Sequence, residues 1–119
     1  MIANVPVFVY GSLKQGFRHA SVIERAQRLG AAAAEPYVLV RYGDYPAMVR
    51  APSGVVLGEL VLVDEQLLLE LDEFEDCPEL YQRERIGLKD GREAFAYLIS
   101  PERARRYPLI AGGVWTEAR

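Results

Sequence analysis

The chain has 119 residues, 50 % hydrophobic and 26 % charged, a balance typical of a single globular domain spanning residues 1–119. Its net charge of −3 offers no basic face for nucleic acid, and no apolar run reaches the roughly 18 residues that span a membrane. One cysteine excludes an internal disulfide, and the N-terminus lacks the pattern of a signal peptide, so a cytoplasmic protein is expected.

The N-terminal part is expected to form a strand, a loop and a helix. Residues 5–10 are β-branched and aromatic, which favours a buried strand that stops at Gly11. A loop then runs to Ala20. The sequence Ser-Val-Ile-Glu at 21–24 is a capping-box pattern, and the apolar spacing after it predicts a helix that ends at Gly30.

The rest of the chain is expected to combine strands with short helices. Asp64 can cap a helix over residues 65–75, and Asp-Gly at 90–91 suits a tight turn between strands. Ser100-Pro101 opens a short helical turn. Further strands are predicted at residues 37–41, 47–50, 55–63, 81–88 and 93–99. About six strands and two or three helices in mixed order favour an α+β fold, with the sheet curled or closed into a small mixed β-barrel.

The loop Tyr10-Gly11-Ser12-Leu13-Lys14 is the first candidate site. A strand that ends in glycine and serine exposes successive backbone N–H groups, and such a concave nest binds carboxylates or a developing oxyanion. The same residues also suit an ordinary turn at the end of a strand. A phosphate-binding P-loop is excluded because the Gly-x-x-x-x-Gly-Lys-Ser/Thr spacing is absent.

The acidic stretch at residues 70–79 holds the second candidate. At about 100° per residue, one arc of the predicted helix holds Glu75 together with four apolar residues: Leu67, Leu68, Leu71 and Phe74. A carboxylate aimed at the apolar interior loses hydration, which raises its pKa toward the range that suits proton transfer. Glu75 could instead pair with a buried cation such as Arg83 or cap a neighbouring loop. The other acids are interpreted as a solvated helix end.

Other reactive residue types are interpreted structurally. The acids lack the spacing of a calcium loop, and one His and one Cys far apart do not suggest zinc. His19 is interpreted as a surface residue or local cap, and Cys77 as a buried structural thiol. Tyr81 and Arg83 share one face of a strand, where they could line a cavity beside Glu75 or brace the barrel wall. We favour the cavity for Tyr81.

Two motifs together resemble a known family. Tyr10-Gly11-Ser12-Leu13 resembles the Y-G-S/T-L signature of the gamma-glutamylcyclotransferase-like (AIG2-like) family. Leu-Asp-Glu-Phe-Glu at 71–75, followed by Tyr81-Gln82-Arg83, resembles its second signature, L-D-x-F-E and then Y-x-R. Asp44-Tyr45-Pro46 is similar to a family loop with a proline beside the site. The resemblance extends over most of the chain.

The resemblance implies a β-barrel with flanking helices that releases an amine from a γ-glutamyl group as 5-oxoproline forms, without metal or organic cofactor. It implies Glu75 as the catalytic acid and base. The implied substrate loop is Tyr10, Gly11, Ser12 and Leu13, and we expect Tyr45 and Tyr81 to bind the substrate as well. One departure is Gly113-Val114-Trp115, where many relatives have Gly-Asp-Trp; if that aspartate touches the substrate amine, Val114 signals a different leaving group.

The expected partner is a small γ-glutamyl molecule, with no nucleic acid and no membrane, and the chain is expected to be a monomer or weak homodimer. A non-catalytic small-molecule-binding module on the same fold is the main alternative, because folds are reused without their chemistry. A buried acid with no task is costly, so Glu75 argues against it. A metal-dependent hydrolase that uses the acids at 70–79 is a third hypothesis.

Overall fold

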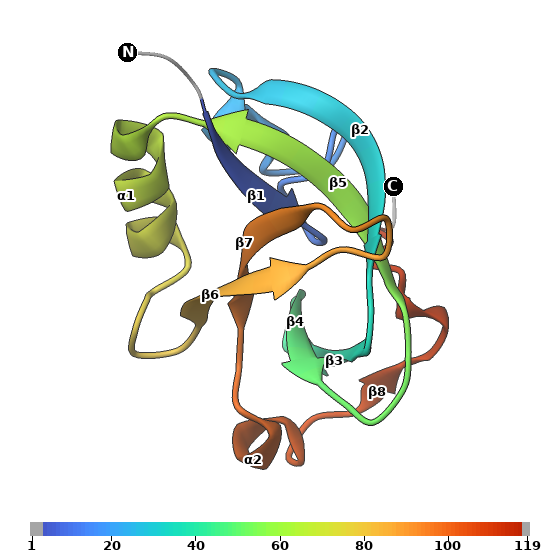
Figure 1. Ribbon diagram of the computed structural model, residues 1–119. Helices are drawn as coiled ribbons and strands as arrows, with labels where there is room; N and C mark the ends of the chain where they lie inside the picture. The colour runs from blue at the N-terminus through green and yellow to red at the C-terminus, as the bar shows by residue number, and fades with distance from the viewer. Residues whose placement is uncertain (1–3, 118–119) are drawn as a thin grey trace.

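The computed structural model describes residues 4–117, which fold around one strongly curled β-sheet (Figure 1). Within this range the sheet has eight strands in the order β2-β5-β1-β7-β4-β3-β8, and β6 pairs with β7 beside this path. The strands are β1 (Val5–Val9), β2 (Gln27–Ala34), β3 (Tyr37–Tyr42), β4 (Tyr45–Arg50), β5 (Val56–Val63), β6 (Gln82–Gly87), β7 (Glu93–Leu98) and β8 (Leu109–Ile110). The α-helices are α1 (Glu65–Phe74) and α2 (Pro101–Ala104), and short 3₁₀ turns lie at Ala20–Ile23 and Ala111–Gly113. The predicted α+β fold with a curled mixed sheet is confirmed.

Strand β1 lies in the middle of the sheet. It pairs antiparallel with β5 along its whole length and meets β7 in parallel at Val7 opposite Phe95. Both faces of β1 are covered, which explains its continuous apolar sequence. Val7 belongs to the apolar cluster that includes α1, whereas Phe8 belongs to a second cluster formed by sheet residues and Trp115. Because side chains alternate along β1, this strand contributes residues to both apolar clusters.

Helix α1 covers one side of the sheet. Leu67, Leu68 and Leu71 are its buried residues, as the apolar spacing predicts. Asp64 caps the helix, since its carboxylate accepts a hydrogen bond from the Leu67 N–H at 2.7 Å. In the described part of the chain, no helix combines the length and apolarity that crossing a membrane requires.

The helix predicted over residues 21–30 is wrong. Residues 20–23 form one 3₁₀ turn, and the chain then enters β2, which pairs antiparallel with β5. The register shifts between Arg28 and Gly30, where Gly30 adopts a φ of 99° that glycine tolerates. Strand β5 offers a full row of backbone donors and acceptors, and pairing with it outweighs the helix propensity of the alanines in β2.

The remaining predicted elements are confirmed to within two residues at each end. The hairpin of β6 and β7 turns at Asp90-Gly91, with Gly91 at a φ of 95°. Ser100 caps α2 by accepting a hydrogen bond from the Arg103 N–H at 3.1 Å. Among residues 4–117 the sheet has two strands more than the six expected, because β2 and the two-residue β8 were not predicted.

Candidate active site

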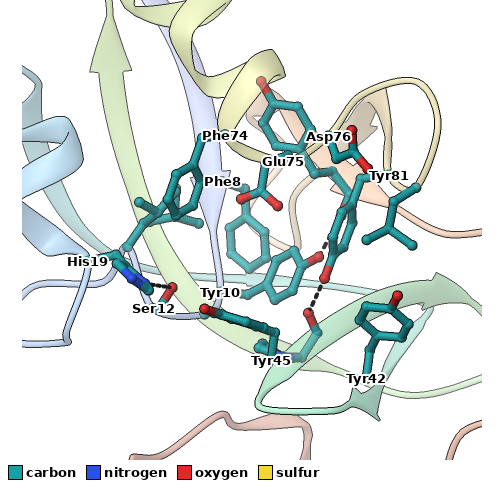
Figure 2. A pocket seen from close by; sticks show the side chains of 16 residues that line it. Phe8, Tyr10, Ser12, His19, Tyr42, Tyr45, Phe74, Glu75, Asp76 and Tyr81 are labelled. Carbon is teal, nitrogen blue, oxygen red and sulfur yellow. Dashed lines mark hydrogen bonds between the residues drawn. The ribbon is translucent and has the colours of Figure 1, made fainter.

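A cavity of about 280 Å³ opens between the end of β1, the turn from β3 to β4 and the end of α1 (Figure 2). All seven residues predicted for the site border it: Tyr10, Gly11, Ser12, Leu13, Tyr45, Glu75 and Tyr81. Apart from His19 and Asp76, the rest of its wall is aromatic or aliphatic. The contributing segments are far apart in sequence and meet because the sheet curls.

The way in which α1 ends sets the direction of Glu75. The helix stops at Phe74, but the Glu75 N–H still donates to the Leu71 carbonyl at 2.9 Å, so Glu75 keeps the helical direction. The next two N–H groups donate back to carbonyls of the last turn in a Schellman arrangement, with Asp76 at a left-handed φ of 53°. The Glu75 side chain points into the cavity (Figure 2).

The carboxyl group of Glu75 lies in an environment that favours its neutral form. Burial raises its pKa from 4.5 to about 7, although part of the residue is exposed where the cavity opens. The alternative ion pair with Arg83 does not form, because the Arg83 Nε lies 3.5 Å from Asp72 instead. Within residues 4–117 no side chain pairs with the Glu75 carboxylate, which leaves it available to a ligand.

Two tyrosine hydroxyls on the cavity wall are held by main-chain groups. Tyr10 donates a hydrogen bond to the Tyr97 carbonyl at 2.6 Å and accepts one from the Met48 N–H at 3.1 Å. Tyr81 donates to the Pro46 carbonyl at 2.8 Å. Burial raises the pKa of both phenols well above the ordinary value. Both side chains therefore remain neutral and rigid near pH 7.

The loop after β1 presents unpaired backbone donors. A turn closes where the Lys14 N–H donates to the Gly11 carbonyl at 3.1 Å. Across the described residues, the N–H groups of Gly11, Ser12 and Leu13 have no acceptor within the protein. A Cβ atom on Gly11 would lie 2.9 Å from Pro46 Cγ, so this close packing requires glycine. The loop can therefore offer N–H groups to an anionic ligand.

His19 is half-buried, and the interpretation of its side chain as a local cap is wrong. Its Nδ1 atom lies 3.0 Å from Ser12 Oγ, and its side chain caps no helix. The ring stacks on Tyr45 at a centroid distance of 6.0 Å and meets Phe74 edge-on at 5.4 Å. His19 thus borders the cavity, and the only signal in the sequence was its position a few residues after the Gly-Ser pair.

Asp72 is the other residue whose role the sequence did not indicate. It was interpreted as part of a solvated helix end, but it accepts a hydrogen bond from the Tyr97 hydroxyl at 2.7 Å and pairs with Arg83. Asp72 therefore ties α1 to β6 and β7. Arg83 belongs to this brace and does not border the cavity, whereas Tyr81 does.

Two further expectations concern metal binding and Val114. Among residues 4–117, no three His, Cys, Asp or Glu side chains gather in a way that could hold a metal ion. Val114 borders a different cavity, beside Lys14 and Glu59. The position of Val114 therefore gives no support to a role in contacting the leaving group.

Comparison with known proteins agrees with the motifs. A family model described as "Gamma-glutamyl cyclotransferase, AIG2-like" matches residues 7–117. A Vibrio cholerae protein with a provisional assignment as a gamma-glutamylcyclotransferase is 38 % identical over 112 residues, covering 93 % of this chain and 95 % of that protein. The gamma-glutamylaminecyclotransferase of Bos taurus is 40 % identical over 107 residues, covering 77 % of this chain but only 64 % of the bovine protein.

The fold agrees as well. The crystal structure of an AIG2-like protein from Mus musculus superimposes with a TM-score of 0.76 at 29 % sequence identity, covering 97 % of this chain and 96 % of the mouse chain. The family predicted from the two motifs is confirmed, and with it the prediction of an enzyme of the cyclotransferase class. Because the family model extends over nearly the whole chain, the chain belongs to the gamma-glutamyl cyclotransferase, AIG2-like family.

Proposed function

We propose that this protein converts a γ-glutamyl amine or γ-glutamyl amino acid into 5-oxoproline and a free amine, with Glu75 as general acid and base. Family membership supports the reaction class. The observation that carries the proposal is the Glu75 carboxyl group, whose pKa burial raises to about 7 and which borders the same cavity as the unpaired N–H groups of the Gly11-Ser12-Leu13 loop. The Glu75 carboxyl group can accept and donate a proton at neutral pH, and the N–H groups of the loop can stabilise negative charge.

The loop binds the glutamyl part of the substrate. Its free N–H groups orient the glutamyl moiety and stabilise the negative charge that develops on the γ-carbonyl oxygen. Tyr10, Tyr45 and Tyr81 provide the aromatic wall that shapes the folded substrate. Since the attacking amine and the carbonyl belong to one molecule, the main task of this wall is to hold them in a near-attack conformation.

The proton path passes through Glu75. Its carboxylate takes one proton from the α-ammonium group, and the freed nitrogen attacks the γ-carbonyl carbon to form the ring C–N bond. The amide C–N bond then breaks, and Glu75 donates its proton to the departing nitrogen. The ring nitrogen loses a second proton, which ends on the released amine as ammonium. No water is consumed, so an apolar cavity favours cyclisation over hydrolysis.

The decisive experiment replaces Glu75 by Gln. Purified wild-type protein is incubated with γ-glutamyl-ε-lysine and γ-glutamyl-alanine, and 5-oxoproline is measured by mass spectrometry. Glu75→Gln should lower turnover at least about a thousandfold while the melting curve stays cooperative. Glu73→Gln is the matched control, because Glu73 is an exposed acid of the same helix that does not border the cavity.

Two results would contradict the proposal in different ways. Near wild-type turnover by Glu75→Gln would exclude the proton-carrier role. Binding of the γ-glutamyl compounds by wild-type protein with no 5-oxoproline formed would identify the chain as a non-catalytic binding module.

A further inference from the structure

A second cavity, of about 530 Å³, adjoins the first. The two share Tyr42, Asp76 and Leu80 as lining residues, so they meet at the turn after α1. The first cavity is largely aromatic, whereas the second is polar. Four charged side chains line the second cavity, one from the turn after α1 and three from α2 and the residues that follow it: Glu79, Glu102, Arg103 and Arg106. A ligand longer than the first cavity can therefore extend into charged surroundings.

The arrangement of the first cavity gives this extension a direction. In Figure 2, Ser12 lies toward one end and Tyr42 and Asp76 toward the other, with Glu75 between them. If the proposed function holds, on which this inference rests, the glutamyl part lies at Ser12 and the amide lies beside Glu75. The leaving amine then points toward Asp76, which is the entrance to the second cavity.

Asp76 occupies a position where glycine would be less strained. It adopts a φ of 53°, the left-handed conformation that ends a helix and that glycine accepts most readily. Its side chain is exposed, borders both cavities and, among the described residues, forms no ion pair. A carboxylate is thus held at the junction with no partner from residues 4–117.

Arg106 provides the opposite charge. Neighbouring Arg103 is occupied, since its Nη1 donates to the carbonyls of Glu79 and Leu80 at 3.2 and 3.1 Å. The Arg106 side chain is exposed, borders the second cavity and has no hydrogen bond or ion pair within residues 4–117. Among residues 4–117, the second cavity therefore offers one unpaired cation, Arg106, and three carboxylates without an ion pair, of which only Asp76 also borders the first cavity; the other two are Glu79 and Glu102.

We propose that the second cavity is a subsite for the far end of the leaving amine, in which Asp76 pairs with an ammonium group and Arg106 with a carboxylate. Leaving groups that end in a free amino acid are preferred over plain alkylamines of the same length. Each pair is solvent-exposed, so each contributes a modest factor of about three- to tenfold in kcat/KM, and raising the salt concentration reduces it.

The test uses four substrates that differ only at that far end. The γ-glutamyl group is joined to one of four amines. Lysine, attached through its ε-nitrogen, carries both an ammonium and a carboxylate at its far end. Cadaverine carries only the ammonium, 6-aminohexanoate only the carboxylate, and pentylamine neither. Asp76→Asn should lower kcat/KM about three- to tenfold, relative to the pentylamine substrate, for the lysine and cadaverine substrates. Arg106→Gln should do so for the lysine and 6-aminohexanoate substrates. Asparagine tolerates the left-handed conformation, so Asp76→Asn keeps the helix end.

Arg105→Gln is the control, because Arg105 is an exposed neighbour that borders neither cavity, and it should leave the four-substrate ranking unchanged. Equal kcat/KM for all four substrates with wild-type protein would overturn the subsite while the cyclotransferase function stands. The same holds if Asp76→Asn and Arg106→Gln change every substrate by one common factor. Absence of 5-oxoproline from all four substrates would overturn both proposals.

Discussion

His19 holds Ser12 through two hydrogen-bonding contacts. Its Nδ1 lies 3.0 Å from Ser12 Oγ, and its backbone N–H donates to the Ser12 carbonyl, also at 3.0 Å. The ring is fixed in turn between Tyr45 and Phe74, and Phe74 directly precedes Glu75. His19 therefore connects the loop that offers free N–H groups to the helix end that carries the acid.

This connection makes His19 a positioning residue. His19→Phe keeps a ring between Tyr45 and Phe74 but loses the side-chain bond to Ser12, so kcat should fall about tenfold with the melting temperature nearly unchanged. His19→Asn, which restores a polar atom near Nδ1, should recover part of the loss. Steady-state kinetics on γ-glutamyl-ε-lysine measure both variants. If the changes in activation free energy caused by Ser12→Ala and His19→Phe simply add in the double variant, the two residues do not act as one unit.

The activity should depend on pH through Glu75. Its carboxylate form accepts the substrate proton, and burial raises its pKa to about 7. The value of kcat/KM should therefore rise about tenfold per pH unit on the acid side and level off above pH 7. The measurement is kcat/KM from pH 5 to 9 at constant ionic strength. A flat profile between pH 5 and 8 would show that another group sets the proton transfer.

The same carboxyl group should make the fold less stable as pH rises. The pKa of Glu75 is about 7 in the folded chain against 4.5 as the ordinary value, so between these pH values the folded state binds more protons than the unfolded state. The free energy of unfolding should fall across this window by about 1–3 kcal/mol. Glu75→Gln should lack this component, whereas Glu73→Gln should keep it. Urea denaturation at pH 5 and pH 8 compares the three proteins, and equal pH dependence in all three would contradict the assignment.

Gly58 in β5 should tolerate no side chain. A Cβ atom there would collide with the Val9 carbonyl oxygen and lie 2.8 Å from Phe8 Cζ, so Gly58→Ala should lower the free energy of unfolding by about 2–4 kcal/mol. Gly87 in β6 is the matched control, since a Cβ atom there meets nothing within 4 Å. Gly87→Ala should be neutral or stabilising by up to about 1 kcal/mol. Similar losses in the two variants would show that the collision does not set the cost at position 58.

Features that depend on neighbouring residues in sequence could be predicted. The Asp64 cap, the leucine spacing of α1 and the direction of Glu75 all follow from residues within a few positions of one another. The hairpin turn at Asp90-Gly91 is equally local. These short-range patterns were sufficient to place the acid on the inner side of its helix.

Features that depend on distant partners could not be predicted. Residues 31–34 are alanines, which favour helices, and only pairing with β5 makes them a strand. The bond between Asp72 and Tyr97 joins residues 25 positions apart, so no spacing rule indicates it. The contact of His19 with Ser12 depends on the path of an irregular loop.

Tyr10 joins two strands that scarcely pair with each other. Strands β4 and β7 share one register position, Met48 opposite Leu98, and the Tyr10 hydroxyl links them by bonding to the Met48 N–H and the Tyr97 carbonyl. A substitution of Tyr10 that removes its hydroxyl would lose both of these buried hydrogen bonds and weaken the contact between β4 and β7. Tyr45, which is 41 % exposed at the rim of the cavity, is the safer starting point for changing what the cavity accepts.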